Sequence, residues 1–151
     1  SNFRDLKISK NKTMRNILLI FISMLVVSAC TLESSKNGYL DGAWRLVRIN
    51  GEVPAQTMLY WNFQGKMLVL DDLMDGKGRF ILRFEHSDGI LSLSQPYIYD
   101  RENGDKELKD STLLRPYGIN DLNMPFAIDI KGKGESMTLK TTDTVLELRN
   151  L

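Results

Sequence analysis

From residue 43 onward, apolar and polar residues alternate in short stretches separated by turn-forming residues. In Arg79–Glu85, phenylalanine and leucine occupy every second position and charged residues most of those between, which is typical of a half-buried strand. Asn50-Gly51 and His86-Ser87-Asp88-Gly89 are typical hairpin turns. The predicted strands are Ala43–Ile49, Thr57–Phe63, Lys66–Asp71, Arg79–Glu85, Ile90–Ser94, Pro96–Asp100, Phe126–Lys131, Met137–Thr141 and Val145–Arg149.

This pattern predicts an all-β fold. Eight or nine short strands at a spacing of roughly ten residues are typical of an antiparallel sandwich or barrel. Sequential hairpins favour an up-and-down eight-stranded barrel, which leaves no exposed sheet edge, with a β-sandwich as the alternative. Arg101–Ser111 is expected to be a charged, irregular stretch, and no amphipathic helix is predicted after residue 38.

A different pattern precedes the strands. The apolar run Ile17–Val27 follows the basic start Met14-Arg15, and it reaches fourteen residues if it is carried through Cys30. A helix of that length spans about 21 Å, against a bilayer core of roughly 30 Å. The run is therefore predicted to be the core of a cleaved signal helix rather than a membrane span.

The end of this run resembles the lipobox of bacterial lipoproteins. Val27-Ser28-Ala29 would be read by lipoprotein signal peptidase, and Cys30, the one cysteine of the chain, would receive the lipid. The predicted organisation is a signal peptide at 1–29 (with 1–13 a possible extension before Met14), a lipidated tether at 30–38 and a barrel domain at 39–151. Thr31 stands where some bacteria place an inner-membrane retention aspartate. An outer-membrane lipoprotein of the bacterial cell envelope, periplasmic or surface-exposed, is expected.

Charge and residue chemistry exclude several classes of function. The whole chain carries +1, but removal of the five basic and one acidic residues of 1–29 leaves fifteen basic and eighteen acidic residues, a net charge of −3. A nucleic-acid partner is therefore not expected. His86 is the only histidine, so neither a catalytic residue nor a metal site is predicted, and no cofactor. Asp71–Gly76 lacks ligands at two positions of a calcium loop.

Gly42-Ala43-Trp44, at the start of the first predicted strand, resembles the G-x-W motif of lipocalins. Together with the closing segment MTLKTTDTVLELRNL, it makes the domain similar to small lipocalin-like (calycin-like) lipoproteins of the Bacteroidetes type. The resemblance implies an eight-stranded barrel closed at one end by Trp44. It also implies that Arg149 packs across Trp44 in a cation–π contact. The helix that follows the barrel in larger lipocalins has no room here.

Aromatic residues are the remaining candidates for ligand binding. The alternation points a set of them inward: Trp44, Trp61, Phe63, Phe80, Phe84 and Phe126. An eight-stranded barrel is wide enough either to be filled by side chains or to hold one small ligand, and six aromatics favour filling. Trp61 and Phe84 are the interior candidates for ligand contact, whereas Tyr97 and Tyr99 would line a mouth or an outer patch.

The functional expectation is a non-catalytic, lipid-anchored binding module for a small apolar or amphipathic ligand or a partner protein. The alternative is an accessory lipoprotein of an envelope complex, with a filled barrel and no small-molecule ligand. The state of the barrel interior distinguishes the two.

Overall fold

The structure is a computed structural model that describes residues 37–56, 58–74 and 78–151. The folded domain lies within the unit Tyr39–Leu151. Its strands are β1 (Gly42–Ile49), β2 (Leu59–Gln64), β3 (Met67–Asp72), β4 (Phe80–Ser87), β5 (Ile90–Ile98), β6 (Lys106–Glu107), β7 (Met124–Lys131), β8 (Ser136–Lys140) and β9 (Val145–Asn150). Two 3₁₀ helices accompany them, η1 (Gly38–Leu40) and η2 (Ser111–Tyr117).

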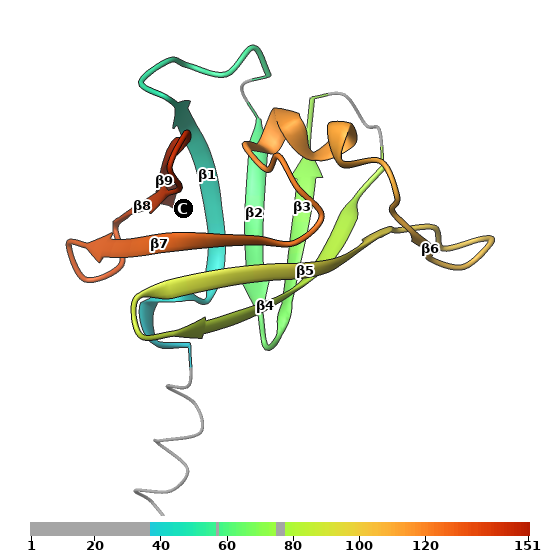
Figure 1. Cartoon of the computed structure of the whole chain (residues 1–151), viewed down its shortest axis with the longest axis horizontal. Coiled ribbons are helices and arrows are strands. Elements are labelled where there is room, and N and C mark those ends of the chain that lie inside the picture. Colours follow the sequence, from blue (N-terminus) through green and yellow to red (C-terminus); the bar gives the residue numbers. More distant parts are fainter. Residues whose placement is uncertain (1–36, 57, 75–77) are drawn as a thin grey trace, which may run out of the picture. The chain divides into compact units, whose positions relative to one another are not determined.

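The strands form a closed antiparallel barrel. Apart from the short β6, each strand pairs with the next one along the chain, β5 pairs with β7, and β9 returns to pair with β1 (Figure 1). Eight strands make the barrel, and the two-residue β6 is added beside β5. The structure confirms the predicted up-and-down barrel and not the alternative sandwich.

Alternation along the strands positions the core. In β1, Trp44 and Leu46 are 0% and 1% exposed, while Arg45 between them faces outward. The predicted strand ends agree with the structure within two residues, as for Thr57–Phe63 against β2. The predicted strands agree with the observed ones because a half-buried strand buries every second side chain, and this alternation is visible in the sequence.

β5 differs from the prediction because it is one strand, where the sequence pattern suggested Ile90–Ser94 and Pro96–Asp100. The pairing with β4 shifts register near the middle of β5, where Gln95 has a φ of +50°. Proline has no N–H to donate to a ladder, so it is tolerated in strands mainly at such bulges. The irregularity interrupts the sequence pattern without ending the strand.

The helix η2 was not predicted. Asp110 precedes it, and its carboxylate accepts hydrogen bonds from the backbone N–H and the hydroxyl of Thr112, at 3.0 and 2.6 Å. These bonds lower the pKa of Asp110 below its ordinary value, with the hydroxyl bond the larger cause. The helix inserts Leu114 and Tyr117 into the core, and the Tyr117 ring lies edge-on to Phe80, with 6.1 Å between ring centroids. Seven residues are too few to show a helical hydrophobic period.

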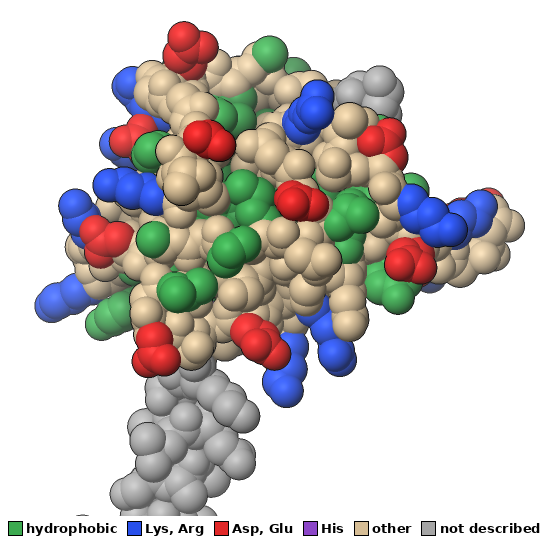
Figure 2. Space-filling view, in the orientation of Figure 1, with side chains coloured by type: hydrophobic (Ala, Val, Ile, Leu, Met, Phe, Trp, Pro, Cys, Tyr) green, Lys and Arg blue, Asp and Glu red, His purple; other side chains and the backbone are tan. Residues whose placement is uncertain are grey.

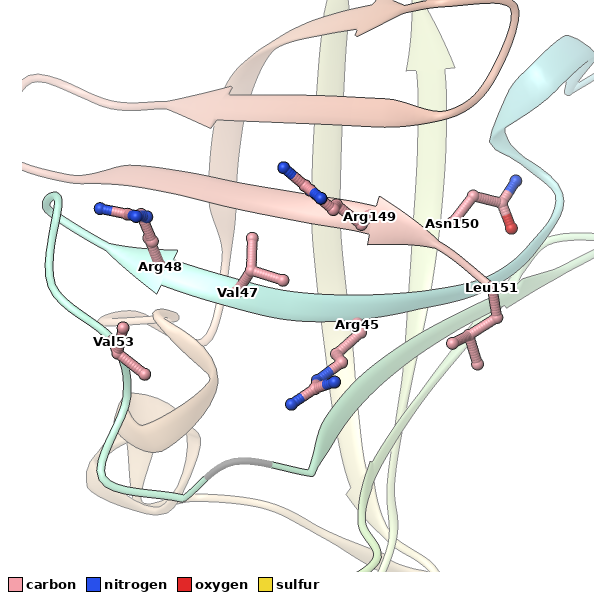
Figure 3. Close-up of a pocket in the computed structure, with 7 residues that line it drawn as sticks. All are labelled: Arg45, Val47, Arg48, Val53, Arg149, Asn150 and Leu151. Carbon is pink, nitrogen blue, oxygen red and sulfur yellow. The ribbon is translucent and has the colours of Figure 1, made fainter.

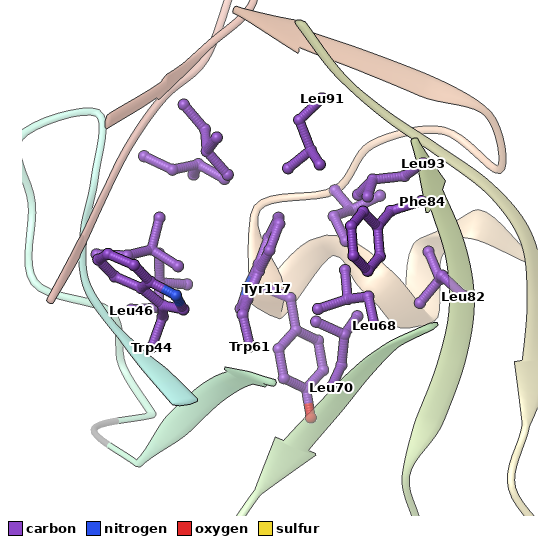
Figure 4. Close-up of a cluster of buried hydrophobic side chains, with 14 of the residues drawn as sticks. Trp44, Leu46, Trp61, Leu68, Leu70, Leu82, Phe84, Leu91, Leu93 and Tyr117 are labelled. Atoms are coloured by element: carbon purple, nitrogen blue, oxygen red, sulfur yellow. The ribbon is translucent and has the colours of Figure 1, made fainter. Parts of the chain in front are cut away.

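The barrel strands, β4 included, send apolar side chains into the barrel interior, where they pack together (Figure 4). Two tryptophans lie among leucines, and Tyr117 enters from η2 (Figure 4). Large side chains that are fully buried include Trp44, Trp61, Phe126, Leu40, Leu46, Leu59, Leu68, Leu70, Leu82, Leu91, Leu93 and Leu114. The interior is a packed core.

On the face shown in Figure 2, basic and acidic side chains are interspersed and the hydrophobic ones form scattered patches. None of the helices in the described part of the chain has the length and apolar character needed to cross a bilayer.

Candidate binding surface

The Gly42-x-Trp44 motif builds the end of the barrel at which the chain enters. Gly42 has a φ of +120°, which side-chain-bearing residues rarely adopt, so glycine allows η1 to turn directly into β1. Trp44 is fully buried, and its indole Nε1–H donates a hydrogen bond of 2.8 Å to the carbonyl oxygen of Leu40. In this structure Trp44 of the motif belongs to the core, whereas Gly42 is exposed.

Arg149 does not pack across Trp44, contrary to the expectation from the resemblance. The residue opposite Trp44 on β9 is Asn150, and Arg149 stands opposite Arg45 on the outer face. Because successive strand residues point to opposite faces, one position in register separates an inward side chain from an outward one. The structure therefore separates Trp44 from Arg149.

The interior candidates Trp61 and Phe84 both lie in the core, 0% and 4% exposed. Phe63 lies between them, with ring centroids 6.2 Å from Trp61 and 5.1 Å from Phe84. Phe126 contacts Trp61 edge-on at 6.1 Å. Among the described residues, Nε1 of Trp61 is the buried side-chain polar atom that lacks a hydrogen-bond partner. These rings fill the barrel rather than line a cavity.

The outer candidates Tyr97 and Tyr99 are 39% and 40% exposed. Tyr97 lies on β5, where its neighbours are Ile81 of β4 and Glu107 of the short β6. The structure thus places this pair on the outside of the barrel, apart from Trp61 and Phe84.

Cys30 and the preceding Val27, Ser28 and Ala29 lie outside the described residues, so their roles stay predictions.

Acidic residues in the described part of the chain serve local structure. No group of three or more metal-ligating side chains occurs there. Asp71 pairs with Arg79 at 3.2 Å. Asp100 accepts hydrogen bonds from the backbone N–H groups of Asn103 and Glu102, and chiefly the bond from Asn103 lowers its pKa. His86 lies exposed near the end of β4.

A groove lined by charged and apolar side chains lies on the outer face of β1 and β9. It has a volume of about 410 Å³, within the range of small-molecule sites. Figure 3 shows arginine side chains spread along the two strands, with Val53 on the loop after β1. The lining residues are Arg45, Val47, Arg48, Val53, Arg149, Asn150 and Leu151.

Of these residues, only Arg149 was predicted to belong to a site, and for another role: the cation–π contact with Trp44. The signal available was that the first and last strands both carry outward-facing arginines. In an up-and-down barrel, closure places the first and last strands side by side. Combining these two observations would have indicated a basic strip.

Comparison with known proteins agrees with this architecture. A lipocalin-like domain family matches residues 24–151. The fold is similar to that of a lipocalin-like protein from Bacteroides uniformis ATCC 8492, with a TM-score of 0.55 and 17% identity over 76% of this chain and 100% of that one. It is also similar to an uncharacterized protein from Bacteroides eggerthii DSM 20697, with a TM-score of 0.52 and 13% identity over 74% of this chain and 98% of the other. No curated protein matches the sequence.

The barrel and its surface define a small β-barrel protein of the kind that generally binds rather than catalyses. The chain belongs to the lipocalin-like domain family.

Proposed function

We propose that this protein is a non-catalytic binding module, anchored by lipid to the outer membrane of a bacterial cell, that recognises its ligand or partner on the outside of the barrel. A lipocalin-like fold supports the binding role. Function is assigned from the fold only as an analogy, so the location of binding rests on the packing inside this barrel.

The filled interior carries the proposal. Trp44 and Trp61 are fully buried, and the ring centroids of Phe63 and Phe84 are 5.1 Å apart. A packed protein core leaves few voids larger than a water molecule. Of the two functions expected from the sequence, this packing favours a protein with a filled barrel and no ligand inside it. Recognition would then use the outer surface of the barrel.

The lipid anchor rests on Cys30 and the segment before it. Each buried CH₂ of an acyl chain contributes about 0.8 kcal/mol to membrane binding, and stable anchoring takes more than one chain or signal. Attachment through a multiply acylated Cys30 would hold the barrel at the outer membrane, either on the periplasmic side or on the cell surface. The proposed function involves no nucleic-acid partner.

We expect Cys30→Ala to abolish both acylation and signal-peptide processing. The measurement is metabolic labelling with a fatty acid, followed by gel mobility of the precursor and mature forms. Ala29→Gly, which keeps a small residue before the cysteine, is the matched control and should be labelled normally. Normal labelling and maturation of Cys30→Ala would overturn the anchor.

We expect the wild-type barrel to show no saturable binding of a neutral apolar probe, N-phenyl-1-naphthylamine, because no space for it remains among the core side chains. Fluorescence titration measures this. Phe84→Ala, studied at a temperature where it is folded, removes a core ring and should gain binding, as apolar cavities bind apolar guests. Saturable one-to-one binding by the wild type would contradict the filled barrel.

A further inference from the structure

Tyr97 lies in a row of side chains that crosses four strands on the outside of the barrel. The register sets Val69 of β3 opposite Ile81 of β4. Ile81 is in turn opposite Tyr97 of β5, which is opposite Glu107 of β6. Directly opposed residues share one face of a sheet, and neighbouring strands lie about 4.8 Å apart. Val69 and Ile81 are half-buried and the other two are exposed, so the row is apolar along most of its length and ends in a carboxylate.

A second, polar row runs beside the first. Asp71 lies two positions after Val69 on β3, and its carboxylate pairs with the guanidinium of Arg79 at 3.2 Å. The backbone N–H of Tyr99 donates to the carbonyl oxygen of Arg79 at 2.8 Å, which places Tyr99 beside Arg79 and two positions after Tyr97. Residues two positions apart in extended backbone point to the same face, about 6.6 Å apart. We call these two rows together the tyrosine platform.

The turn that follows the two tyrosines is fixed by a network of hydrogen bonds. The carboxylate of Asp100 accepts hydrogen bonds from the backbone N–H groups of Glu102 and Asn103, at 3.0 and 3.1 Å. The N–H of Asp100 itself donates to the carboxylate of Asp105 at 3.0 Å. This turn leads from β5 to β6 and reaches away from the barrel (Figure 1). The platform is therefore preorganised, which lowers the entropy cost of binding.

The polar groups of the platform are available to a ligand. Within the described part of the chain, no hydrogen bond or ion pair engages the hydroxyl groups of Tyr97 and Tyr99 or the carboxylate of Glu107. A purely apolar partner that covered this face would strip water from these groups without replacing its hydrogen bonds, which costs free energy. The face therefore favours a ligand that combines apolar and hydrogen-bonding surface.

A pyranose sugar has a surface of this kind. Its ring presents C–H groups on its two faces and hydroxyl groups around its edge. The C–H groups carry partial positive charge, which favours contact with the negative face of an aromatic ring. The hydroxyl groups donate strong hydrogen bonds to a carboxylate and exchange hydrogen bonds with phenolic hydroxyls.

We propose that the tyrosine platform binds a neutral, extended oligosaccharide, with one sugar ring stacked on Tyr97, another on Tyr99, and Glu107 accepting hydrogen bonds from sugar hydroxyls. An open sheet face suits a flat, extended chain, because sites for single small molecules are concave. Asp71 and Arg79 balance each other, so the carboxylate of Glu107 disfavours an acidic sugar. The inference rests on the proposed function in placing recognition outside the barrel, and it names the ligand class.

The test is a calorimetric titration of the full chain reconstituted in phosphatidylcholine nanodiscs, with empty discs as the blank. The probes are the β-(1→4)-linked hexamers of glucose, mannose and N-acetylglucosamine, their monosaccharides, and hexagalacturonate. We expect at least one neutral hexamer to bind roughly tenfold tighter than its monosaccharide, which reaches only one tyrosine, and tighter than hexagalacturonate. No saturable binding of any neutral hexamer would overturn the proposal, and so would tighter binding of hexagalacturonate.

Substitutions locate the binding. Tyr97→Ala and Tyr99→Ala should each weaken binding of the preferred hexamer about tenfold, because each removes one stacking surface. Tyr97→Phe keeps the ring and should lose less affinity than Tyr97→Ala. Tyr39→Ala, at an exposed tyrosine of η1 outside the platform, is the matched control and should bind as the wild type does. Unchanged affinity in either platform alanine variant, with a native circular dichroism spectrum, would overturn the proposal.

Glu107→Gln separates direct contact from a loss of folding. It should weaken binding of the neutral hexamer severalfold, because a neutral acceptor forms weaker hydrogen bonds than a carboxylate. It should also tighten binding of hexagalacturonate, because it removes a like charge. Unfolding would lower both affinities together, so parallel changes for the two probes would contradict the placement of Glu107 at the sugar.

This experiment and those for the proposed function fail independently. No hexamer binding, together with normal labelling at Cys30 and no binding of N-phenyl-1-naphthylamine, would overturn the platform alone. Saturable binding of N-phenyl-1-naphthylamine, together with hexamer binding that depends on Tyr97, would overturn the filled barrel alone.

Discussion

Gly118→Ala is expected to destabilise the barrel by about 2–5 kcal/mol. Gly118 ends η2 with a φ of +84°, and its N–H donates to the carbonyl of Arg115 at 2.9 Å. A Cβ there would overlap Cδ2 of Leu146 and lie 2.9 Å from its Cδ1. The left-handed backbone costs an alanine about 1–2 kcal/mol, and overpacking a core costs about 1–3 kcal/mol more.

Leu146 cannot yield easily, because it is fully buried in the core. The matched control is Gly89→Ala in the β4–β5 turn, where φ is +74° and a Cβ would meet nothing within 4 Å. That variant should lose only the backbone contribution, about 1–2 kcal/mol. Urea unfolding followed by tryptophan fluorescence measures both. Equal losses in the two variants would mean that the contact between Gly118 and Leu146 does not constrain the fold.

The two buried tryptophans are expected to respond differently to the same substitution. Trp44→Phe breaks the hydrogen bond to Leu40 and leaves a buried carbonyl unpaired, since Leu40 is 0% exposed. Trp61→Phe removes an indole N–H that has no partner among the described residues. An unpaired buried polar group costs about 1–3 kcal/mol; Trp44→Phe creates one and Trp61→Phe removes one, so Trp44→Phe should be the less stable variant by about 2–6 kcal/mol.

Both substitutions exchange an indole for a phenyl ring at a fully buried position, so the loss of volume is matched between them. Chemical denaturation of each variant gives the difference directly. Equal stabilities would show that a buried water completes the hydrogen bonding of Trp61, because ordered water commonly satisfies such groups. Lower stability of Trp61→Phe would contradict the assignment of roles to the two indoles.

The groove on β1 and β9 was harder to predict from the sequence than the fold. The groove depends on which residue of β9 stands opposite Arg45, and the pairing between β1 and β9 contains a bulge between Leu46 and Arg48. A shift of one residue would place Arg149 inside the barrel, opposite to where it lies. Nothing in either strand alone specifies that register.

The inward aromatics, by contrast, could be predicted. Trp44, Trp61 and Phe126 lie at alternating apolar positions of their strands, and all three are buried as expected. Phe80 is only half-buried, since it lies at the first residue of β4 and packs on Tyr117 of a helix that was not foreseen.

The sequence by itself determined the class of fold, most strand boundaries and the face of each strand that enters the core. It could do so because the side-chain period of a strand is a local property of the backbone. Only the tertiary structure decided that the barrel interior is filled, that β5 is one strand through Gln95, and that Arg45 meets Arg149 outside. Those features arise from packing and pairing between distant segments, for which local periodicity contains no information.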